Sequence, residues 1–179
     1  MFSNIRADMK RYKEYGGWYK NPGFWVTFVY RYGSWASSIR PKIFSIPFRL
    51  LYVFFRFPFR LFYHVYIATS VKIGPGLLLE HPFMIMIVGD AIIGKECTIF
   101  HDVTFGKGPK KGDPQIGDHV VIFPGARVLG GIDVGENAHI GANVVLQKTI
   151  PPWTMVIPPQ SKTIPEAMVK RLLGIKTEE

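Results

Sequence analysis

Residues 114–146, PQIGDHVVIFPGARVLGGIDVGENAHIGANVVL, carry an apolar residue at every sixth position. The same period runs back to Ile67, with two extra residues in one step and five in another. The residues on the period are Ile73, Leu79, Ile87, Ile93, Ile99, Phe105, Ile116, Ile122, Val128, Val134, Ile140 and Leu146. A six-residue period predicts a parallel β-helix, in which three hexapeptides form one coil and the apolar residues fill the core. An ordinary β-sandwich does not explain twelve matches with only two localised insertions.

Glycine often follows the apolar residue of this period, as at Gly74, Gly94 and Gly117. Glycine adopts backbone conformations that other residues avoid, so we expect it to turn the corners of the prism. The single cysteine, Cys97, excludes a disulfide framework and fits a reducing compartment. Its position within a predicted coil indicates a small core residue rather than a nucleophile.

The first 66 residues differ in composition from the rest. Residues 1–66 hold 11 Lys and Arg against 2 Asp and Glu, whereas residues 67–179 hold 11 of each. Residues 1–66 also carry 21 of the 26 aromatic residues. We therefore predict a basic, aromatic helical appendage over 1–66, a β-helix domain over 67–160, and a C-terminal capping helix and tail over 161–179. The closing helix is expected from Pro165 to Leu173.

The appendage has the pattern of a helix that lies on a membrane. The run SIPFRLLYVFFRFPFRLFYHVY, residues 45–66, has no stretch of ~18 apolar residues that could cross a bilayer. Arg49, Arg56 and Arg60 fall within about 40° on a helical wheel. We expect these arginines to meet anionic headgroups while the other faces enter the interface. The alternative is that the helices only pack on the β-helix or on neighbouring subunits.

Two further expectations concern the appendage. Pro58 should kink its helix or split it in two. The stretch NPGFWVTFVYRYGSWASS, residues 21–38, should form another helix with Pro22 near its start.

The start of the chain, MFSNIRADMKRYKEY, lacks the features of a signal peptide, so we expect a cytoplasmic protein peripheral to the inner face of the cell membrane. P-loop, dinucleotide and nucleic-acid motifs are absent from the sequence, and no nucleic-acid partner is expected.

The histidines are the candidates for chemistry. His81 lies two residues after Leu79, and His101 lies two residues after Ile99. Their separation of 20 residues equals one coil of 18 plus the two-residue insertion, so they should lie one above the other. Glu80 precedes the first histidine and Asp102 follows the second. His119 and His139 have other offsets within their hexapeptides.

From about Tyr66 to Pro158 the chain resembles the serine O-acetyltransferase branch of the left-handed β-helix hexapeptide acyltransferases. The segments that carry the resemblance are IGPGLLLEHPFMIMIVGDAIIGKECTIFHDVTFGKGPK and PQIGDHVVIFPGARVLGGIDVGENAHIGANVVLQKTIPP, residues 73–110 and 114–152. The resemblance implies that His81 is the catalytic histidine. Glu80 stands at the position of the aspartate that precedes this histidine in the family. It also aligns Gly106 and Lys110 with the family's glycine-rich turn, and it implies a homotrimer.

The sequence departs from this family at three places. Tyr66 stands where the family has the carboxylate that orients the histidine. Gly112 and Asp113 replace an Arg-His pair that helps to hold serine. The long helical N-terminal domain of the family is replaced by a shorter basic, aromatic appendage. This arrangement, with a histidine at the position of His101, is closer to the small O-acetyltransferases of exopolysaccharide biosynthesis, of the colanic-acid type. We expect Tyr66, Asp102 and Asp113 on the acceptor side of the site.

The predicted function is transfer of an acetyl group from acetyl-coenzyme A to a sugar hydroxyl in exopolysaccharide, capsule or glycan biosynthesis. A neutral imidazole suits the role of general base, which we assign to His81, with His101 as the competing candidate. The alternatives are a serine O-acetyltransferase and a β-helix without transferase activity that binds metal or serves as a scaffold. The acceptor is expected to be a saccharide, possibly lipid-linked.

Coenzyme A is long, and it is strongly anionic at its nucleotide end. Lys107, Lys110 and Lys111 lie in the five-residue insertion and Lys148 lies further along, so these lysines are candidates for the phosphates. Small residues would let the pantetheine arm lie close to the coils, and the candidates are Gly106, Ala126, Gly141 and Ala142. Zinc sites of this architecture need three converging histidines, whereas only His81 and His101 share a register, so no metal is predicted.

Overall fold

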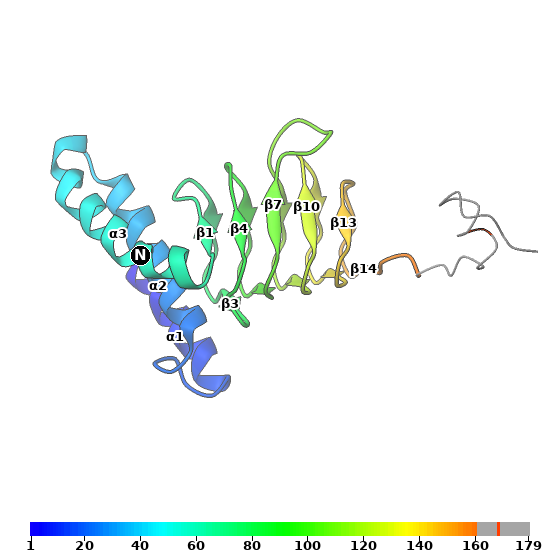
Figure 1. Cartoon of the computed structure of the whole chain (residues 1–179), viewed down its shortest axis with the longest axis horizontal. Helices are drawn as coiled ribbons and strands as arrows, with labels where there is room; N and C mark the ends of the chain where they lie inside the picture. The colour runs from blue at the N-terminus through cyan, green and yellow to red at the C-terminus, as the bar shows by residue number, and fades with distance from the viewer. Residues whose placement is uncertain (161–167, 169–179) are drawn as a thin grey trace, which may run out of the picture.

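The computed structural model describes residues 1–160 and Met168, and these residues form three helices followed by fourteen short strands (Figure 1). The helices are α1 (Phe2–Glu14), α2 (Pro22–Ser38) and α3 (Lys42–Phe62). Pro22 occupies the first turn of α2, and the side chain of Asn21 accepts a hydrogen bond from the Gly23 N–H at its start. The helix expected over residues 21–38 is therefore confirmed.

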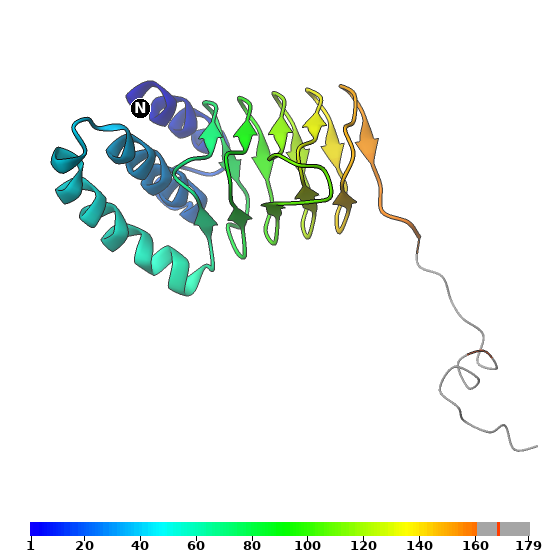
Figure 2. The same cartoon turned by 90° about the horizontal axis from the view of Figure 1, so that it is seen from above.

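The strands stack in register into three parallel sheets. One sheet, called sheet A here, contains β1 (Tyr66–Ile67), β4 (Met86–Ile87), β7 (Thr104–Gly106), β10 (Arg127–Leu129) and β13 (Val145–Leu146). Sheet B contains β2 (Lys72–Ile73), β5 (Ile92–Ile93), β8 (Gln115–Ile116) and β11 (Asp133–Val134). Sheet C contains β3 (Leu78–Leu79), β6 (Thr98–Ile99), β9 (Val121–Ile122), β12 (His139–Ile140) and β14 (Met155–Val156). The predicted β-helix is confirmed, and Figure 2 shows its coils in a row.

The residues on the six-residue period form the core of the prism. Ile87, Ile99, Phe105 and Ile122 have no exposed surface, and every residue on the period from Ile67 to Leu146 is buried. Each coil covers the next, so apolar burial is continuous along the stack and stabilises it as a unit.

The glycines of sheet B have a different role from the one expected. A Cβ on Gly74 would lie 2.7 Å from the carbonyl carbon of Gly94, and one on Gly94 would lie 2.5 Å from the carbonyl oxygen of Gly117. These glycines are thus needed because successive coils approach closely there, not because of a positive φ. Positive φ angles at the corners are often held by other residues, among them Glu96 and Asn137.

The corner between β3 and β4 is longer than those above it. Ile87 pairs with Phe105 and Leu79 pairs with Ile99, so the lower coil holds the two extra residues between these points. His81 and Met84 both adopt left-handed backbone conformations in this corner, with φ angles of 52° and 55°. The insertion therefore changes the backbone path at the position of the candidate histidine.

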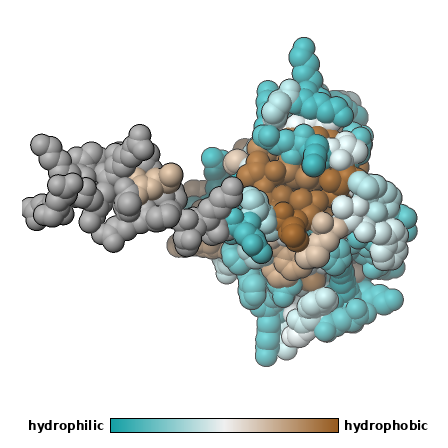
Figure 3. Space-filling model, turned by 90° about the vertical axis from the view of Figure 1, so that its right-hand side faces the viewer, coloured by the Kyte–Doolittle hydropathy of each residue, from teal (hydrophilic) through white to brown (hydrophobic). Residues whose placement is uncertain are grey.

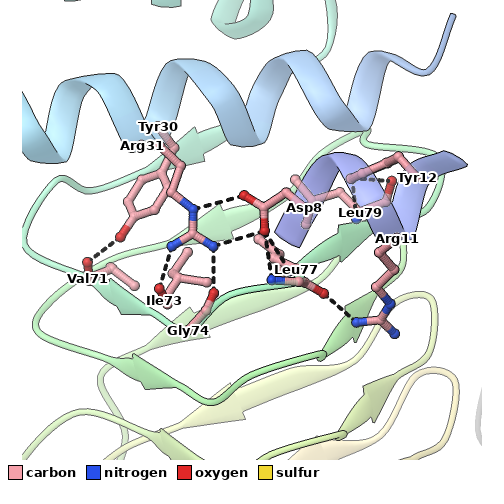
Figure 4. Close-up of polar contacts among 11 residues, drawn as sticks. Asp8, Arg11, Tyr12, Tyr30, Arg31, Val71, Ile73, Gly74, Leu77 and Leu79 are labelled. Carbon is pink, nitrogen blue, oxygen red and sulfur yellow. Dashed lines mark hydrogen bonds and ion pairs between the residues drawn. The ribbon is translucent and has the colours of Figure 1, made fainter. Parts of the chain in front are cut away.

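Polar contacts attach α1 and α2 to the first coil (Figure 4). The Asp8 carboxylate pairs with the Arg31 guanidinium and accepts hydrogen bonds from the N–H groups of Gly76 and Leu77 at 2.8 and 3.1 Å. The Arg31 guanidinium in turn donates to the carbonyl oxygens of Ile73 and Gly74. Burial raises the pKa of the Asp8 carboxyl, although Arg31 and the two N–H groups act in the opposite direction. The helices are thus fixed to the β-helix by buried, directional contacts.

The helix α3 runs without interruption through Pro47 and Pro58, so Pro58 does not split it in two, and a kink at Pro58 stays a prediction. Pro58 lies in the final turn and a half of the helix, where only a few backbone hydrogen bonds remain to be lost. The expected grouping of three arginines toward headgroups also needs correction. The Arg56 guanidinium lies over the rings of Tyr52 and Tyr66, at 5.3 and 5.6 Å from their centroids, and so points toward the protein.

The far end of the stack carries apolar side chains at its surface (Figure 3). The most exposed large ones in this part of the chain are Val145, Trp153, Met155 and Ile157. The closing helix expected from Pro165 to Leu173 lies outside the described residues, apart from Met168. Within the described part of the chain, none of the helices is long and apolar enough to cross a bilayer.

Candidate active site

The two candidate histidines occupy the same corner of the prism, between sheets C and A. Leu79 pairs with Ile99, and Ile99 with Ile122, so the residues two positions later form one column. Ile122 pairs in turn with Ile140, so the column contains His81, His101, Pro124 and Ala142. The rings of His81 and His101 lie 6.4 Å apart between centroids, at an angle of 67°. The stacking expected from the spacing is therefore present.

His81, and not His101, opens onto a depression of about 320 Å³. One wall is formed by Leu78, Glu80, His81 and Pro82 at the end of β3. The opposite wall is the loop between α1 and α2, which contributes Tyr15, Gly16, Gly17, Lys20, Asn21 and Pro22. The depression brings an exposed imidazole, a carboxylate and an ammonium group together beside a cavity that a small polar molecule can enter.

Sequence reasoning missed the contribution of the α1–α2 loop. Gly16 and Gly17 have φ angles of 88° and 104°, and the pair marks a turn in the sequence. The turn directs Tyr15 and Lys20 toward a corner some sixty positions further along the chain. No local pattern reports that contact, because it depends on how the Asp8–Arg31 pair holds the helices on the first coil.

The carboxylate of Asp102 does not orient His81. It accepts a hydrogen bond from the Arg127 guanidinium at 3.0 Å, and the same guanidinium donates to the Asp102 main-chain carbonyl. Among the described residues, no side chain forms a hydrogen bond with the ring of His81. The Nδ1 atom of His101 is buried without a hydrogen-bond partner in the described part of the chain.

Tyr66 and Asp113 are engaged elsewhere within a single chain. The ring of Tyr66 lies under the guanidinium groups of Arg56 and Arg60, at 5.6 and 5.7 Å. A carboxylate oxygen of Asp113 accepts a hydrogen bond from the Asp90 N–H at 3.1 Å. This contact places Asp113 at the corner between sheets A and B, away from His81 within a single chain, and its assignment to the acceptor side stays a prediction.

The lysines gather at the corner between sheets A and B. Phe105 pairs with Val128 and Val128 with Leu146, so Lys107 and Lys148 occupy the same position two coils apart. The loop that follows β7, seen at the top of Figure 1, carries Lys110 and Lys111 and encloses a space of about 290 Å³ with Lys107, Gly108, Gly112 and Asp113. Four exposed ammonium groups on one edge suit an anionic ligand. This edge and the histidine column lie at opposite ends of β7.

The small residues expected beside the pantetheine arm separate into two groups. Ala126 is fully buried and Gly106 is buried as well, so both belong to the interior of the coils. A Cβ on Gly141 would lie 2.7 Å from the Val156 carbonyl oxygen, so this glycine is needed for coil packing. Of the four candidates only Ala142 is exposed, and it belongs to the column of His81 and His101.

Cys97 is a core residue, as expected. It has no exposed surface, and burial raises the pKa of its thiol to about 11. His119 lies at a different corner, with Nδ1 at 3.9 Å from a carboxylate oxygen of Glu96. Over residues 1–160, no group of three histidine, cysteine or acidic side chains is arranged to hold a metal ion.

Comparison with known proteins assigns the repeat to a class. Residues 113–148 match the bacterial transferase hexapeptide family, described as six repeats. A solved serine acetyltransferase in complex with CoA superposes with a TM-score of 0.68 at 25% identity, covering 87% of this chain and 65% of that one. The fold is therefore the left-handed β-helix of the hexapeptide transferases.

Two curated relatives are serine acetyltransferases. That of Mycobacterium tuberculosis is 39% identical over 100 residues, which is 51% of this chain and 44% of the relative. That of Helicobacter pylori strain J99 is 39% identical over 101 residues, which is 55% of this chain and 59% of the relative. The chain thus spans about half the length of the curated relatives it matches. These names favour the serine alternative over the exopolysaccharide branch that the sequence departures indicated.

Proposed function

We propose that this protein is an O-acetyltransferase that uses acetyl-coenzyme A as donor and His81 as general base. The observation that carries the proposal is the place of His81, exposed at the lengthened corner and at the mouth of a depression that also contains Glu80 and Lys20. The match of residues 113–148 to a transferase family and the acetyltransferase relatives support the reaction class.

The proposed reaction needs one proton acceptor and no change of oxidation state. The imidazole of His81 takes the proton from the acceptor hydroxyl as its oxygen attacks the thioester carbonyl. The carbon–sulfur bond then breaks, and the imidazolium returns the proton to the departing thiolate. The same ring thus serves as base and then as acid in one cycle.

The donor is proposed to lie along two features: the edge that carries Lys107, Lys110, Lys111 and Lys148, called the lysine edge here, and the column that contains His81 and His101. These four lysines would neutralise the phosphates, and the small side chain of Ala142, two coils from His101 in the same column, leaves room for the pantetheine arm. The complex of a solved serine acetyltransferase with CoA supports this class of donor. We also propose a homotrimer, as the family resemblance implies, and light scattering of the purified protein would measure its mass.

L-serine is the first candidate acceptor, because the relatives and the solved structure that match this chain are serine acetyltransferases. The acceptor would enter the depression beside His81, where Lys20 can meet a carboxylate and Glu80 an ammonium group.

A saccharide hydroxyl is the second candidate, and a specific observation favours it. Gly112 and Asp113 supply no cation at the two sequence positions where the resembling family has the Arg-His pair that helps to hold serine, and the Asp113 carboxylate accepts a hydrogen bond from the Asp90 N–H. Tyr15 beside the depression offers an aromatic face of the kind that packs against sugar rings.

Labelled acetyl-coenzyme A incubated with L-serine and with a saccharide panel tests the proposal. Acetylation of serine alone supports the first acceptor, and acetylation of a saccharide alone supports the second. If no hydroxyl compound is acetylated while coenzyme A also fails to bind, the transferase proposal is wrong.

A further inference from the structure

The helix α3 presents an apolar face to the outside of the molecule. Only Ser45 and Tyr52 are buried along its 21 residues, and both lie on the side that packs against α2. On a helical wheel the side opposite Tyr52 carries residues that are between about half and three-quarters exposed: Ile43, Leu50, Val53, Phe54, Phe57 and Leu61. We call these six residues the outer face of α3. Figure 2 shows α3 along the outer edge of the helical appendage, with its C-terminal end beside the first coil.

The helical appendage that carries this face has a large excess of exposed positive charge. Of the eleven Lys and Arg residues in 1–66, Arg31 is paired with Asp8 and Arg11 donates to main-chain carbonyls of the β-helix. Eight others are exposed, against one exposed acid, Glu14. They are Arg6, Lys10, Lys13, Lys20, Arg40, Lys42, Arg49 and Arg60.

Three of these cations border the outer face directly. Lys42, Arg49 and Arg60 fall within about 20° of one another on the helical wheel, along the boundary between the outer face and the buried side. A helix that lies in a headgroup plane places its charges at such a boundary and its apolar side chains below it. Arg56 does not take part, because it is half-buried with its guanidinium over Tyr52 and Tyr66. Arg60 also lies over the Tyr66 ring, at 5.7 Å from its centroid, but it stays exposed and can meet a headgroup.

The positive charge of the appendage discriminates between two possible partners for the outer face of α3, a second copy of the chain and a lipid surface. A second copy of the chain would bring an equally basic appendage against this one, and like charges around an apolar contact oppose association. An anionic lipid surface supplies an apolar layer in which the outer face can be buried. It also supplies negatively charged headgroups that pair with the cations at the boundary of that face. At 1.5 Å per residue the helix is about 30 Å long, enough to make a continuous contact in the plane of a bilayer.

We propose that α3 docks on an anionic phospholipid bilayer, with its outer face in the interface and Lys42, Arg49 and Arg60 at the headgroups. The docking holds the β-helix beside the membrane without crossing it. The inference goes beyond the proposed acyl transfer and does not depend on it, since no residue of α3 lines the depression at His81.

The test is co-sedimentation of the full chain with vesicles of phosphatidylcholine, alone or mixed in equal parts with phosphatidylglycerol. One variant removes apolar contact, Phe54→Ser with Phe57→Ser, and another removes charge, Lys42→Gln with Arg49→Gln. Trp153→Ser, an exposed aromatic at the other end of the molecule, controls for the first. Lys72→Gln with Lys95→Gln removes the same charge from the β-helix and controls for the second.

The wild-type chain should sediment with the mixed vesicles and not with phosphatidylcholine alone. One basic residue at an anionic surface changes partitioning about fivefold, so the charge variant should lose about 25-fold. The apolar variant should stay in solution, both controls should bind like wild type, and the circular dichroism spectrum and the unfolding transition should match wild type in every variant as evidence of folding. Absence of sedimentation with either vesicle, or equal binding by the charge variant and wild type, overturns the proposal. A loss of self-association in the apolar variant without any vesicle binding identifies the face as a protein contact and also overturns it.

Discussion

Asp8 of α1 and Arg31 of α2 form a buried ion pair, with 3.0 Å between the Asp8 Oδ2 and the Arg31 Nε. Their side chains are only 2% and 5% exposed. The carboxylate also accepts main-chain hydrogen bonds from Gly76 and Leu77, which belong to the first coil. A single pair therefore joins two helices to the β-helix and sets the position of the loop that faces His81.

Asp8→Ala should reduce the free energy of unfolding by about 3–5 kcal/mol, because it leaves the Arg31 charge buried without its partner. Chemical denaturation followed by circular dichroism measures the change. Glu14→Ala, an exposed acid on the same helix, serves as the control and should change stability by less than about 0.5 kcal/mol. Equal stability of the two variants would show that the pair does not hold the helices on the coil.

Gly33→Ala should destabilise the protein, although alanine usually stabilises a helix over glycine by about 0.5–1 kcal/mol. A Cβ at position 33 would lie 2.3 Å from the buried ring of Tyr52, across the contact between α2 and α3. Overpacking of this kind costs about 1–3 kcal/mol. Thermal unfolding of Gly33→Ala, and of the same change combined with Tyr52→Leu, measures the effect. A stability above wild type for the single variant would contradict the close contact.

Cys97 should resist alkylation in the folded protein. The thiolate is the reactive form, and the folded protein keeps the thiol protonated until about pH 11, above its ordinary pKa near 9. Iodoacetamide at pH 8 and pH 9 should label the unfolded chain quickly and the folded chain at least about tenfold more slowly, as read by intact mass. Because the folded-state pKa is the higher one, ionisation of this thiol should weaken the fold only as the pH rises above about 9. Equal labelling of both states would place Cys97 at the surface.

The lysine edge should contribute to binding of acetyl-coenzyme A and not to the rate of the chemical step. Lys107→Ala with Lys110→Ala removes two cations, and the KM for acetyl-coenzyme A should rise about tenfold or more while kcat changes little. Steady-state kinetics over a range of donor concentrations separates the two constants. Lys95→Ala, an exposed lysine at another corner, is the matched control. A fall in kcat at unchanged KM would move these lysines from donor binding to another role.

Much of the fold follows from the sequence, because each apolar residue of the six-residue period is buried by its neighbours one coil away. Ile99 and Ile122, for example, pair directly in sheet C. The stacking of His81 on His101 follows from the same arithmetic, since a parallel coil returns each corner to the same place.

The sequence could not reveal contacts that depend on the docking of the helices. Arg56 shares a face with Arg49 and Arg60 in the sequence pattern, but Tyr66 of the first coil draws its guanidinium inward. Tyr15 and Lys20 reach His81 only because α1 and α2 are fixed on the coil. Ala126 is fully buried and Gly141 lies against the next coil, so small size at these two positions has a packing reason that the sequence pattern could not separate from ligand contact.

The most direct test of the proposed mechanism is the turnover of His81→Ala compared with that of His101→Ala, using labelled acetyl-coenzyme A and the acceptor that the wild-type protein acetylates. His81→Ala should lose about 10²–10⁴-fold in kcat, as expected for a missing general base, while coenzyme A binding and the unfolding transition stay close to those of wild type. His101→Ala should keep more activity, because its ring does not line the depression. Near-normal turnover by His81→Ala, with His101→Ala inactive but folded, would contradict the account and assign the base to His101.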